Sequence, residues 1–226
     1  MHGWDWLVAD RVPVPEWSFG FSTLTVNPGT GNPASAACDG DIYATAATYA
    51  DARDGAGTGI DLNGTSTLTV ANALSGDFTV ARVGTNFDTS VLGSTALISA
   101  AEYSAYCLAT LALSIRLVTN SWPATSYSVD EFAAFGTTAQ SDSNPVLVIT
   151  QYNTWTLNAT GRGSVSLTGV TKFGLRAETD ISNSEPAANN ITRFSASETT
   201  GTSQDPKLVI TYTVSSPSAS LSPSAS

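Results

Sequence analysis

The sequence has few charges and almost no histidine. Charged residues make up 12% of the 226 residues, about half of the fraction near 25% that is usual in globular proteins. The single histidine, His2, is expected at a flexible terminus, so we exclude Ser-His-Asp and Cys-His catalysis, and one histidine cannot form a multi-histidine zinc site. Two local carboxylate pairs, Asp39/Asp41 and Asp130/Glu131, leave a glycosidase as the remaining catalytic alternative. We therefore predict that the protein is not an enzyme.

Basic residues are scarce and scattered. Nine lysines and arginines against nineteen acidic residues give a formal net charge of −10. Binding to nucleic acid depends on clustered positive charge, so we exclude a nucleic-acid partner. No run reaches the roughly 18 apolar residues needed to cross a membrane. The first residues, MHGWDWLVAD, lack the basic and apolar regions of a signal peptide. We expect a soluble protein with no membrane insertion and no export signal in this chain.

Cysteine is also rare. Two cysteines, Cys38 and Cys107, are too few for a disulfide scaffold and too far apart in sequence for a metal knuckle. They could form one disulfide if the fold brings their Cα atoms to about 5–6 Å. Two unpaired thiols, with Cys107 buried in a strand, are the alternative.

Period-2 alternation of apolar and polar residues dominates the rest of the chain. The alternating runs are rich in valine, isoleucine, threonine and aromatic residues, and glycine, asparagine, aspartate and proline bound them, which is typical of β-strands. The sequence predicts an all-β fold, a two-sheet antiparallel jelly-roll sandwich with one or two short helical turns. The predicted strands include residues 66–70, 78–83, 113–118, 146–150, 171–176 and 207–214, and the run 146–150 is apolar enough for a sandwich core.

Helical turns are expected at two places. Ser128 is followed three residues later by Glu131, the spacing of a capping box, and a second turn is expected within residues 158–167. We divide the chain into an aromatic N-terminal segment (1–33), the sandwich (34–214) and a Ser/Pro/Ala-rich tail (215–226) of low complexity.

The N-terminal segment is unusually aromatic. Trp4, Trp6, Trp17 and Phe19 are too apolar to be left in water. They either pack on the sandwich as an extra strand or bind a neighbouring subunit by strand addition to an exposed sheet edge. The second alternative makes these four residues a subunit contact.

Two ligand sites are candidates. Calcium prefers several oxygen ligands from carboxylates and loop carbonyls, and one loop-rich region contains Asp39, Asp41, Asp51, Asp54 and Asp61. Acidic turns that use aspartate for local hydrogen bonds are the alternative.

A glycan site would use exposed aromatic rings as stacking platforms. Trp122, Tyr127 and Phe132 lie in an expected loop and are the candidates. Packing in the core or against a loop is the alternative for each ring.

Six stretches follow one another along the chain: FDTS (87–90), LISAAEYSAY (97–106), WTLNATG (155–161), GVTKFGLR (169–176), DPKLVITYT (205–213) and SPSASLSPSAS (216–226). In this order they resemble the DNRLRE-type jelly-roll modules of bacterial surface proteins and phage-like structural proteins. The resemblance covers roughly residues 40–226 and implies a non-catalytic β-sandwich used in assembly, display or attachment.

These observations predict a structural or adhesive protein of a phage virion or extracellular filament, located in the virion or at the cell surface. The expected partners are further copies or other virion or filament subunits. The alternative is a glycan-binding module of a larger surface protein, stabilised by calcium and binding a surface polysaccharide.

Overall fold

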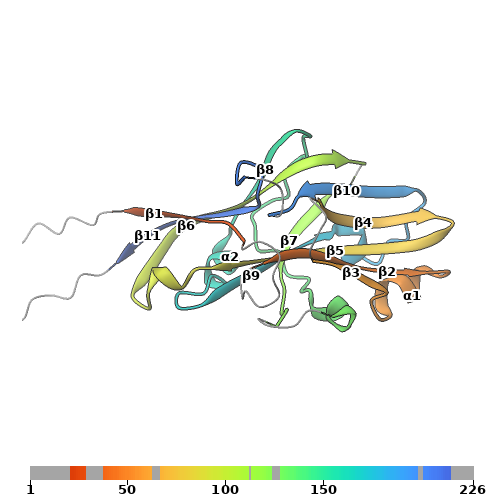
Figure 1. Cartoon of the computed structure of the whole chain (residues 1–226), viewed down its shortest axis with the longest axis horizontal. Coiled ribbons are helices and arrows are strands. Elements are labelled where there is room, and N and C mark those ends of the chain that lie inside the picture. Colours follow the sequence, from red (N-terminus) through yellow and green to blue (C-terminus); the bar gives the residue numbers. More distant parts are fainter. Residues whose placement is uncertain are drawn as a thin grey trace, which may run out of the picture.

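The computed structural model describes residues 21–28, 38–62, 67–111, 113–123, 128–197 and 201–214. Within these ranges the protein is all-β, as the alternation predicts, and eleven antiparallel strands form one continuous sheet (Figure 1). The strands are β1 (Ser22–Val26), β2 (Asp39–Ala46), β3 (Gly59–Asp61), β4 (Thr67–Ser75), β5 (Asp77–Asp88), β6 (Ala96–Thr110), β7 (Ile115–Thr119), β8 (Gln151–Thr156), β9 (Val170–Ala177), β10 (Asn189–Ser195) and β11 (Lys207–Val214).

Helices are few and short in the part of the chain that the structure describes. They are α1 (Tyr49–Asp54), η1 (Ser90–Leu92), η2 (Val129–Ala134), α2 (Ala159–Gly163) and α3 (Glu178–Ile181). The capping box at Ser128 and Glu131 is present and begins η2, and α2 forms within the second predicted helical region. None of the described helices is long and apolar enough to cross a membrane.

Two long strands fold the sheet over on itself, because each changes partner along its length. β5 pairs with β4 as far as Ala81 and with β9 from Val83 onward. β6 pairs with β11 along its first part and with β10 from Cys107 onward, and β8 lies on its other side. The strands around β6 therefore face the strands around β5 and β9, an arrangement consistent with a sandwich of the jelly-roll class.

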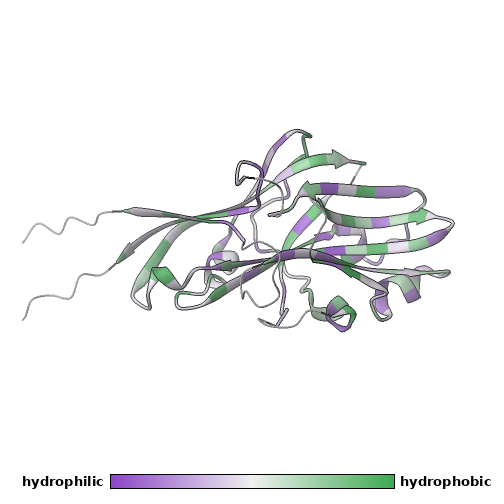
Figure 2. Cartoon of the chain, viewed as in Figure 1, coloured by the Kyte–Doolittle hydropathy of each residue, from purple (hydrophilic) through white to green (hydrophobic). Residues whose placement is uncertain are grey.

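The main core fills the space between these two groups of strands. Tyr103 of β6 lies near its centre and contacts the rings of Phe87, Trp155 and Phe173 edge-on, with ring centroids 5.9, 5.7 and 6.5 Å away. Apolar and polar residues alternate along most strands (Figure 2), so each strand can turn one face to this core. The period-2 alternation of the sequence is therefore explained by the packing of one face of each strand against this core.

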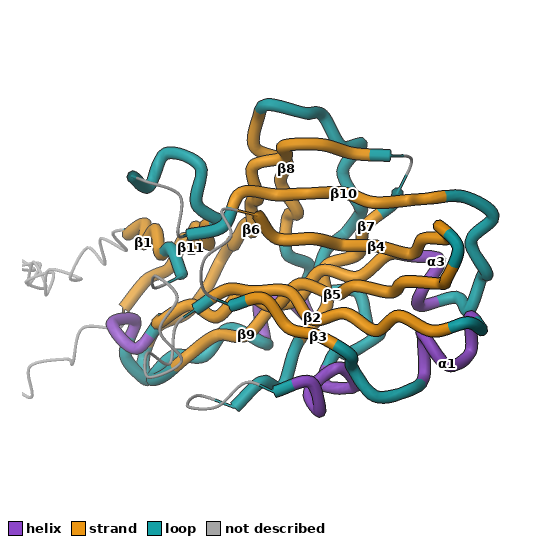
Figure 3. Tube along the Cα trace, turned by 45° about the vertical axis from the view of Figure 1, so that its right-hand side comes forward, coloured by secondary structure: helices purple, strands orange, loops and turns teal. Residues whose placement is uncertain are grey.

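A second core covers the outer face of β2 and β5. It contains Ile42, Val80, Trp122, Phe132 and neighbouring apolar residues, and α1 and η2 close it from outside. Figure 3 shows α1 and α3 beside each other at one end of the strands, where the Tyr49 hydroxyl donates to the Thr179 carbonyl at 3.3 Å. The strands β5, β7 and β9 are thus covered on both faces, whereas β2 keeps Tyr43 and Thr45 exposed on one face.

One predicted core strand is wrong. Residues 146–150 form no strand: Val146, Val148 and Ile149 are exposed, and the chain turns at Thr150. β8 occupies the place beside β6 instead, because its Trp155 is fully buried and donates from Nε1 to the Ile115 carbonyl at 2.9 Å. The other predicted strands are present.

Part of the N-terminal segment belongs to the sheet. β1 pairs with β11 from Ser22 to Val26 and is the last strand on that side among the described strands. The predicted subunit-contact residues Trp4, Trp6, Trp17 and Phe19 lie outside the described residues, as does the tail 215–226.

Candidate functional site

The predicted calcium ligands do not come together. Asp39 is buried and accepts hydrogen bonds from the Ser197 amide and hydroxyl, at 3.0 and 2.7 Å. Asp51 accepts from the Thr48 hydroxyl at the start of α1, and Asp54 pairs with its neighbour Arg53. Within the described ranges, no group of three histidine, cysteine, aspartate or glutamate side chains could hold a metal ion. The geometry therefore favours local contacts for Asp51 and Asp54, while Asp39 binds Ser197, a residue far away in sequence.

Asp41 lies opposite Asp61 in the pairing of β2 with β3. Burial raises the pKa of Asp41 from its ordinary 3.8 to about 7, and repulsion from Asp61 adds to the effect, while a hydrogen bond from the Thr69 backbone opposes it. Two carboxylates without further ligands form no calcium site, but Asp41 becomes a group that titrates near neutral pH.

The predicted sugar platforms are not exposed. Trp122 and Phe132 are 0% and 1% exposed, so neither ring can stack on a glycan, and this part of the prediction is wrong. Trp122 packs against Phe135 and lies so close to Gly84 that a side chain there would reach within 2.7 Å of the indole. Tyr127 lies outside the described residues. A loop position in the sequence does not reveal which core the loop covers, and here the loop covers the second core.

The two cysteines hold separate buried thiols, and no disulfide joins them. Cys38 precedes β2, where its carbonyl accepts from the Asn86 amide at 2.7 Å. Cys107 lies in β6 opposite Phe194 of β10. The predicted bridge is therefore absent, and the alternative of a buried Cys107 in a strand is correct.

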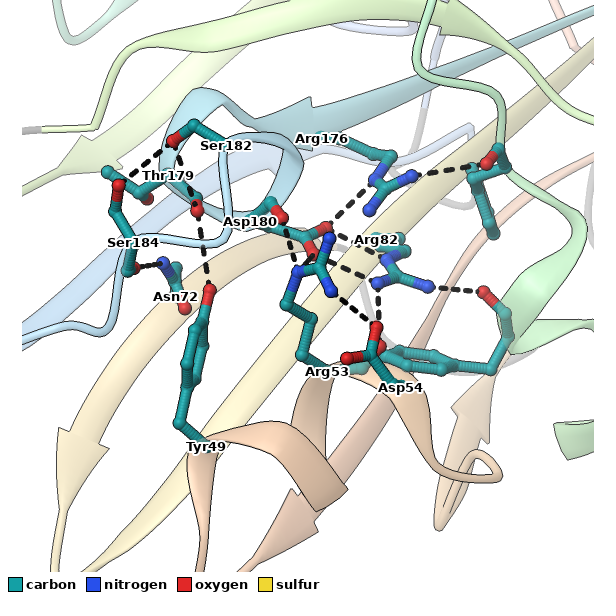
Figure 4. Close-up of polar contacts among 12 residues, drawn as sticks. Tyr49, Arg53, Asp54, Asn72, Arg82, Arg176, Thr179, Asp180, Ser182 and Ser184 are labelled. Atoms are coloured by element: carbon teal, nitrogen blue, oxygen red, sulfur yellow. Dashed lines mark hydrogen bonds and ion pairs between the residues drawn. The ribbon is translucent and has the colours of Figure 1, made fainter.

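A buried ion-pair network is the largest group of charges in the described part of the chain, and sequence reasoning missed it (Figure 4). Asp180 is fully buried. Arg82 donates to both of its carboxylate oxygens, each at 2.9 Å, and Arg176 donates to Oδ2 at 2.8 Å. Burial alone would raise the pKa of Asp180, but the hydrogen bonds from the two arginines outweigh it and lower that pKa.

All three arginines around Asp180 also donate to backbone carbonyls. Arg82 donates to the carbonyls of Phe132 and Arg53, and Arg176 donates to those of Phe135 and Gly136. Arg53 donates to the carbonyl of Asp180 at 2.7 Å. The network thus ties α1, η2 and α3 to β5 and β9, and its geometry is that of a structural cross-link. Its only sequence signal is in β5, where Arg82 falls on the same face as the apolar Phe78 and Val80, whereas Arg176 follows the polar phase of β9.

Exposed apolar side chains gather instead at the two ends of β6. The strand-start surface consists of Phe21, Val91, Leu97 and Val214, which are 53–69% exposed. They are close together because Phe21 precedes β1, Val214 ends β11 opposite Ala96, and Val91 lies just before β6. The strand-end surface consists of Leu111, Val146, Val148 and Ile149, which are 47–90% exposed.

The strand-end surface is held in place by specific contacts. Asn153 of β8 accepts from the Val148 amide at 2.7 Å and donates to the Val148 carbonyl at 2.9 Å. Thr150 has a φ of 60°, a conformation that β-branched residues rarely adopt, and its amide donates to the Cys107 carbonyl at 2.7 Å. Leu147, between the exposed valines, packs on the main core. An exposed apolar patch lowers solubility and a strained residue lowers stability, and retention of both favours a binding role for this segment.

Comparison with known proteins adds no relative. No family model matches the sequence, and no curated protein matches it. The resemblance to DNRLRE-type modules therefore rests only on the stretches that carry it.

Proposed function

We propose that the protein is a non-catalytic structural subunit of a phage virion or extracellular filament, in which copies associate end to end. The observation that carries this proposal is the position of the two exposed apolar surfaces. Leu97 lies near the start of β6 and Leu111 directly follows its end. Fourteen residues of strand at about 3.3 Å each separate them by roughly 45 Å.

Two different apolar surfaces on one subunit favour a head-to-tail contact. Such a contact joins unlike surfaces of neighbouring copies and produces rings or open filaments. None of the eight side chains that define the two surfaces is charged, which suits burial in a subunit interface because charged residues are depleted at interface cores. The chain's net charge of −10 would keep separate assemblies apart in solution.

The sheet edge beside the strand-start surface supports the same proposal. β1 reads S-T-L-T-V, with no charge and no proline, and it is the last strand on its side of the described sheet. Monomeric proteins usually protect such an edge with charges, bulges or covering loops. Two other edges of the sheet are protected in such ways. The edge strand β3 is only three residues long, and the segment from Gly136 to Gln140 covers the outer edge of β7 by donating hydrogen bonds to it.

The resemblance to DNRLRE-type modules also implies assembly or display. Location in a virion or at a cell surface is part of the proposal, since a surface with few charges and many serine, threonine and asparagine residues suits such proteins.

The test is the oligomeric state of the full chain over a range of concentrations, by sedimentation velocity and negative-stain microscopy. We expect rings or filaments. Val146→Asp adds a charge to a side chain that is 90% exposed, so it should release monomers that keep the circular dichroism spectrum of the folded protein. Ser75→Asp, at the exposed end of β4, is the matched control and should assemble normally. A wild-type chain that stays monomeric at all concentrations contradicts the proposal.

A further inference from the structure

The strand-end surface borders a groove of about 410 Å³. Leu113, Pro145, Val146 and Leu147 form its apolar part. Asn144 lies on its polar side, where Nδ2 donates to Glu178 at 2.6 Å and to the Ser114 hydroxyl at 3.3 Å. A groove with one apolar and one polar side suits an aromatic side chain that carries a polar group, because an indole can bury its rings and still donate its N–H.

The groove wall is formed before any partner binds. The contacts of Asn153 and Thr150 hold the segment that contains Val146 and Leu147, and Leu147 is anchored in the main core. A preformed site avoids part of the entropy cost of ordering a loop on binding.

The chain itself contains a matching aromatic segment. Residues 1–20, which lie outside the described ranges, include Trp4, Trp6, Trp17 and Phe19. They lead directly into Phe21 of the strand-start surface. Phe21 lies near the start of β6, because its neighbour Ser22 pairs with Tyr212 and Tyr212 pairs with Ile98 of β6. Figure 1 shows β1 and β11 beside each other at one end of the described part of the molecule.

The position of this segment favours a partner copy over the same chain. The groove lies at the far end of β6, roughly 45 Å from the start of the strand by the rise of about 3.3 Å per residue. In a head-to-tail contact, by contrast, the strand-start surface of one copy meets the strand-end surface of the next. The groove then lies directly beside the point where residues 1–20 join the sheet.

We infer that residues 1–20 of one copy bind with their tryptophans in the groove beside Val146 and Leu147 of the next copy. The inference rests on the proposed end-to-end assembly and specifies which segment makes the contact. Tryptophan is enriched among residues that dominate interface energies, and a central apolar pocket is where such residues bind.

Cross-linking between two isotopically distinct copies tests this contact in the full chain. The ¹⁵N-labelled variant Asp5→Cys, whose new thiol lies between Trp4 and Trp6, is mixed with unlabelled Ser143→Cys, oxidised and weighed intact. The native thiols do not compete, because Cys38 and Cys107 are 2% and 0% exposed. We expect a mixed-isotope dimer in at least about tenfold higher yield than with Ser75→Cys, since docking raises the effective concentration of the two thiols toward the millimolar range.

Two further variants complete the test. Replacing Trp4 and Trp6 by alanine in the Asp5→Cys chain should lower the mixed dimer to the yield of Ser75→Cys. A chain with both Asp5→Cys and Ser143→Cys should cross-link to other copies and not close on itself. Closure within one chain, or intact assemblies with no preference for Ser143→Cys, overturns the inference while the proposed assembly stands. If the wild-type chain does not assemble, both the inferred contact and the proposed end-to-end assembly are wrong.

Discussion

Asn153 holds the backbone of Val148 with both atoms of its side-chain amide. The Oδ1 atom accepts from the Val148 amide at 2.7 Å, and Nδ2 donates to the Val148 carbonyl at 2.9 Å. A residue of β8 thereby replaces the strand partner that the apolar run 146–149 would have had in a sheet. This contact keeps three exposed apolar side chains in a defined place.

Asn153→Ala should therefore loosen the strand-end surface. Asn153 is 4% exposed and also donates to the Gln151 carbonyl. Loss of these hydrogen bonds should lower the free energy of unfolding by about 1–3 kcal/mol and weaken assembly. Chemical denaturation measures the free energy of unfolding, sedimentation velocity measures assembly, and hydrogen exchange at the Val148 amide measures the loosening of the segment. Gln151→Ala, at a neighbouring exposed position, should change neither; unaltered exchange at Val148 in Asn153→Ala would show that the contact does not hold the segment.

Thr150→Asn should stabilise the protein. Thr150 is exposed with a φ of 60°, a region that asparagine tolerates much better than a β-branched residue. We expect the free energy of unfolding to rise by about 0.5–1 kcal/mol, read from thermal and chemical denaturation. The matched change Thr156→Asn, at an exposed position of β8, should give no gain because asparagine is unfavourable in a strand. A loss of stability in Thr150→Asn would refute strain at this turn.

Asp180→Asn should be the most destabilising of these substitutions. It leaves the buried guanidinium groups of Arg82 and Arg176 without their carboxylate, at a cost of about 3–5 kcal/mol in unfolding free energy. Asp54→Asn, whose side chain is 60% exposed, should cost at most about 0.5 kcal/mol. Equal effects of the two substitutions in denaturant unfolding would contradict the role of the network.

The same network predicts a pH dependence. Because the pKa of Asp180 is lowered, its contribution to stability is present above the ordinary pKa and is lost as the pH falls through the lowered value.

Asp41 should make the protein less stable as the pH rises, which is opposite to the effect of Asp180. Its pKa rises from 3.8 to about 7 on folding, so between these values the folded state binds a proton that the unfolded state has released. Its contribution is fully present below pH 3.8 and is lost as the pH rises through about 7, a change of about 1–4 kcal/mol. Asp41→Asn should remove this slope and be more stable than wild type at pH 8. Unfolding measured from pH 4 to 8 checks this, with the exposed Asp77→Asn as a control that keeps the wild-type slope.

Local pattern was sufficient to predict much of the fold. A strand buried on one face must alternate, and β4, β5, β7, β9 and β11 were found where the alternation placed them. The capping box at Ser128 predicted η2 because it satisfies backbone groups next to it in sequence. Both signals arise from neighbouring residues, and so a single sequence carries them.

Tertiary structure alone decided the remaining features, because each depends on residues far apart in the chain. The run 146–149 has a strand's composition, but β8 takes the place beside β6, where Trp155 fills the main core. Asp180 becomes a buried ion-pair partner because β5 and β9 lie side by side and bring Arg82 and Arg176 together. The sequence by itself determined an all-β chain with a surface of few charges. Competition for places in the sheet decided which apolar residues stay exposed at the two ends of β6.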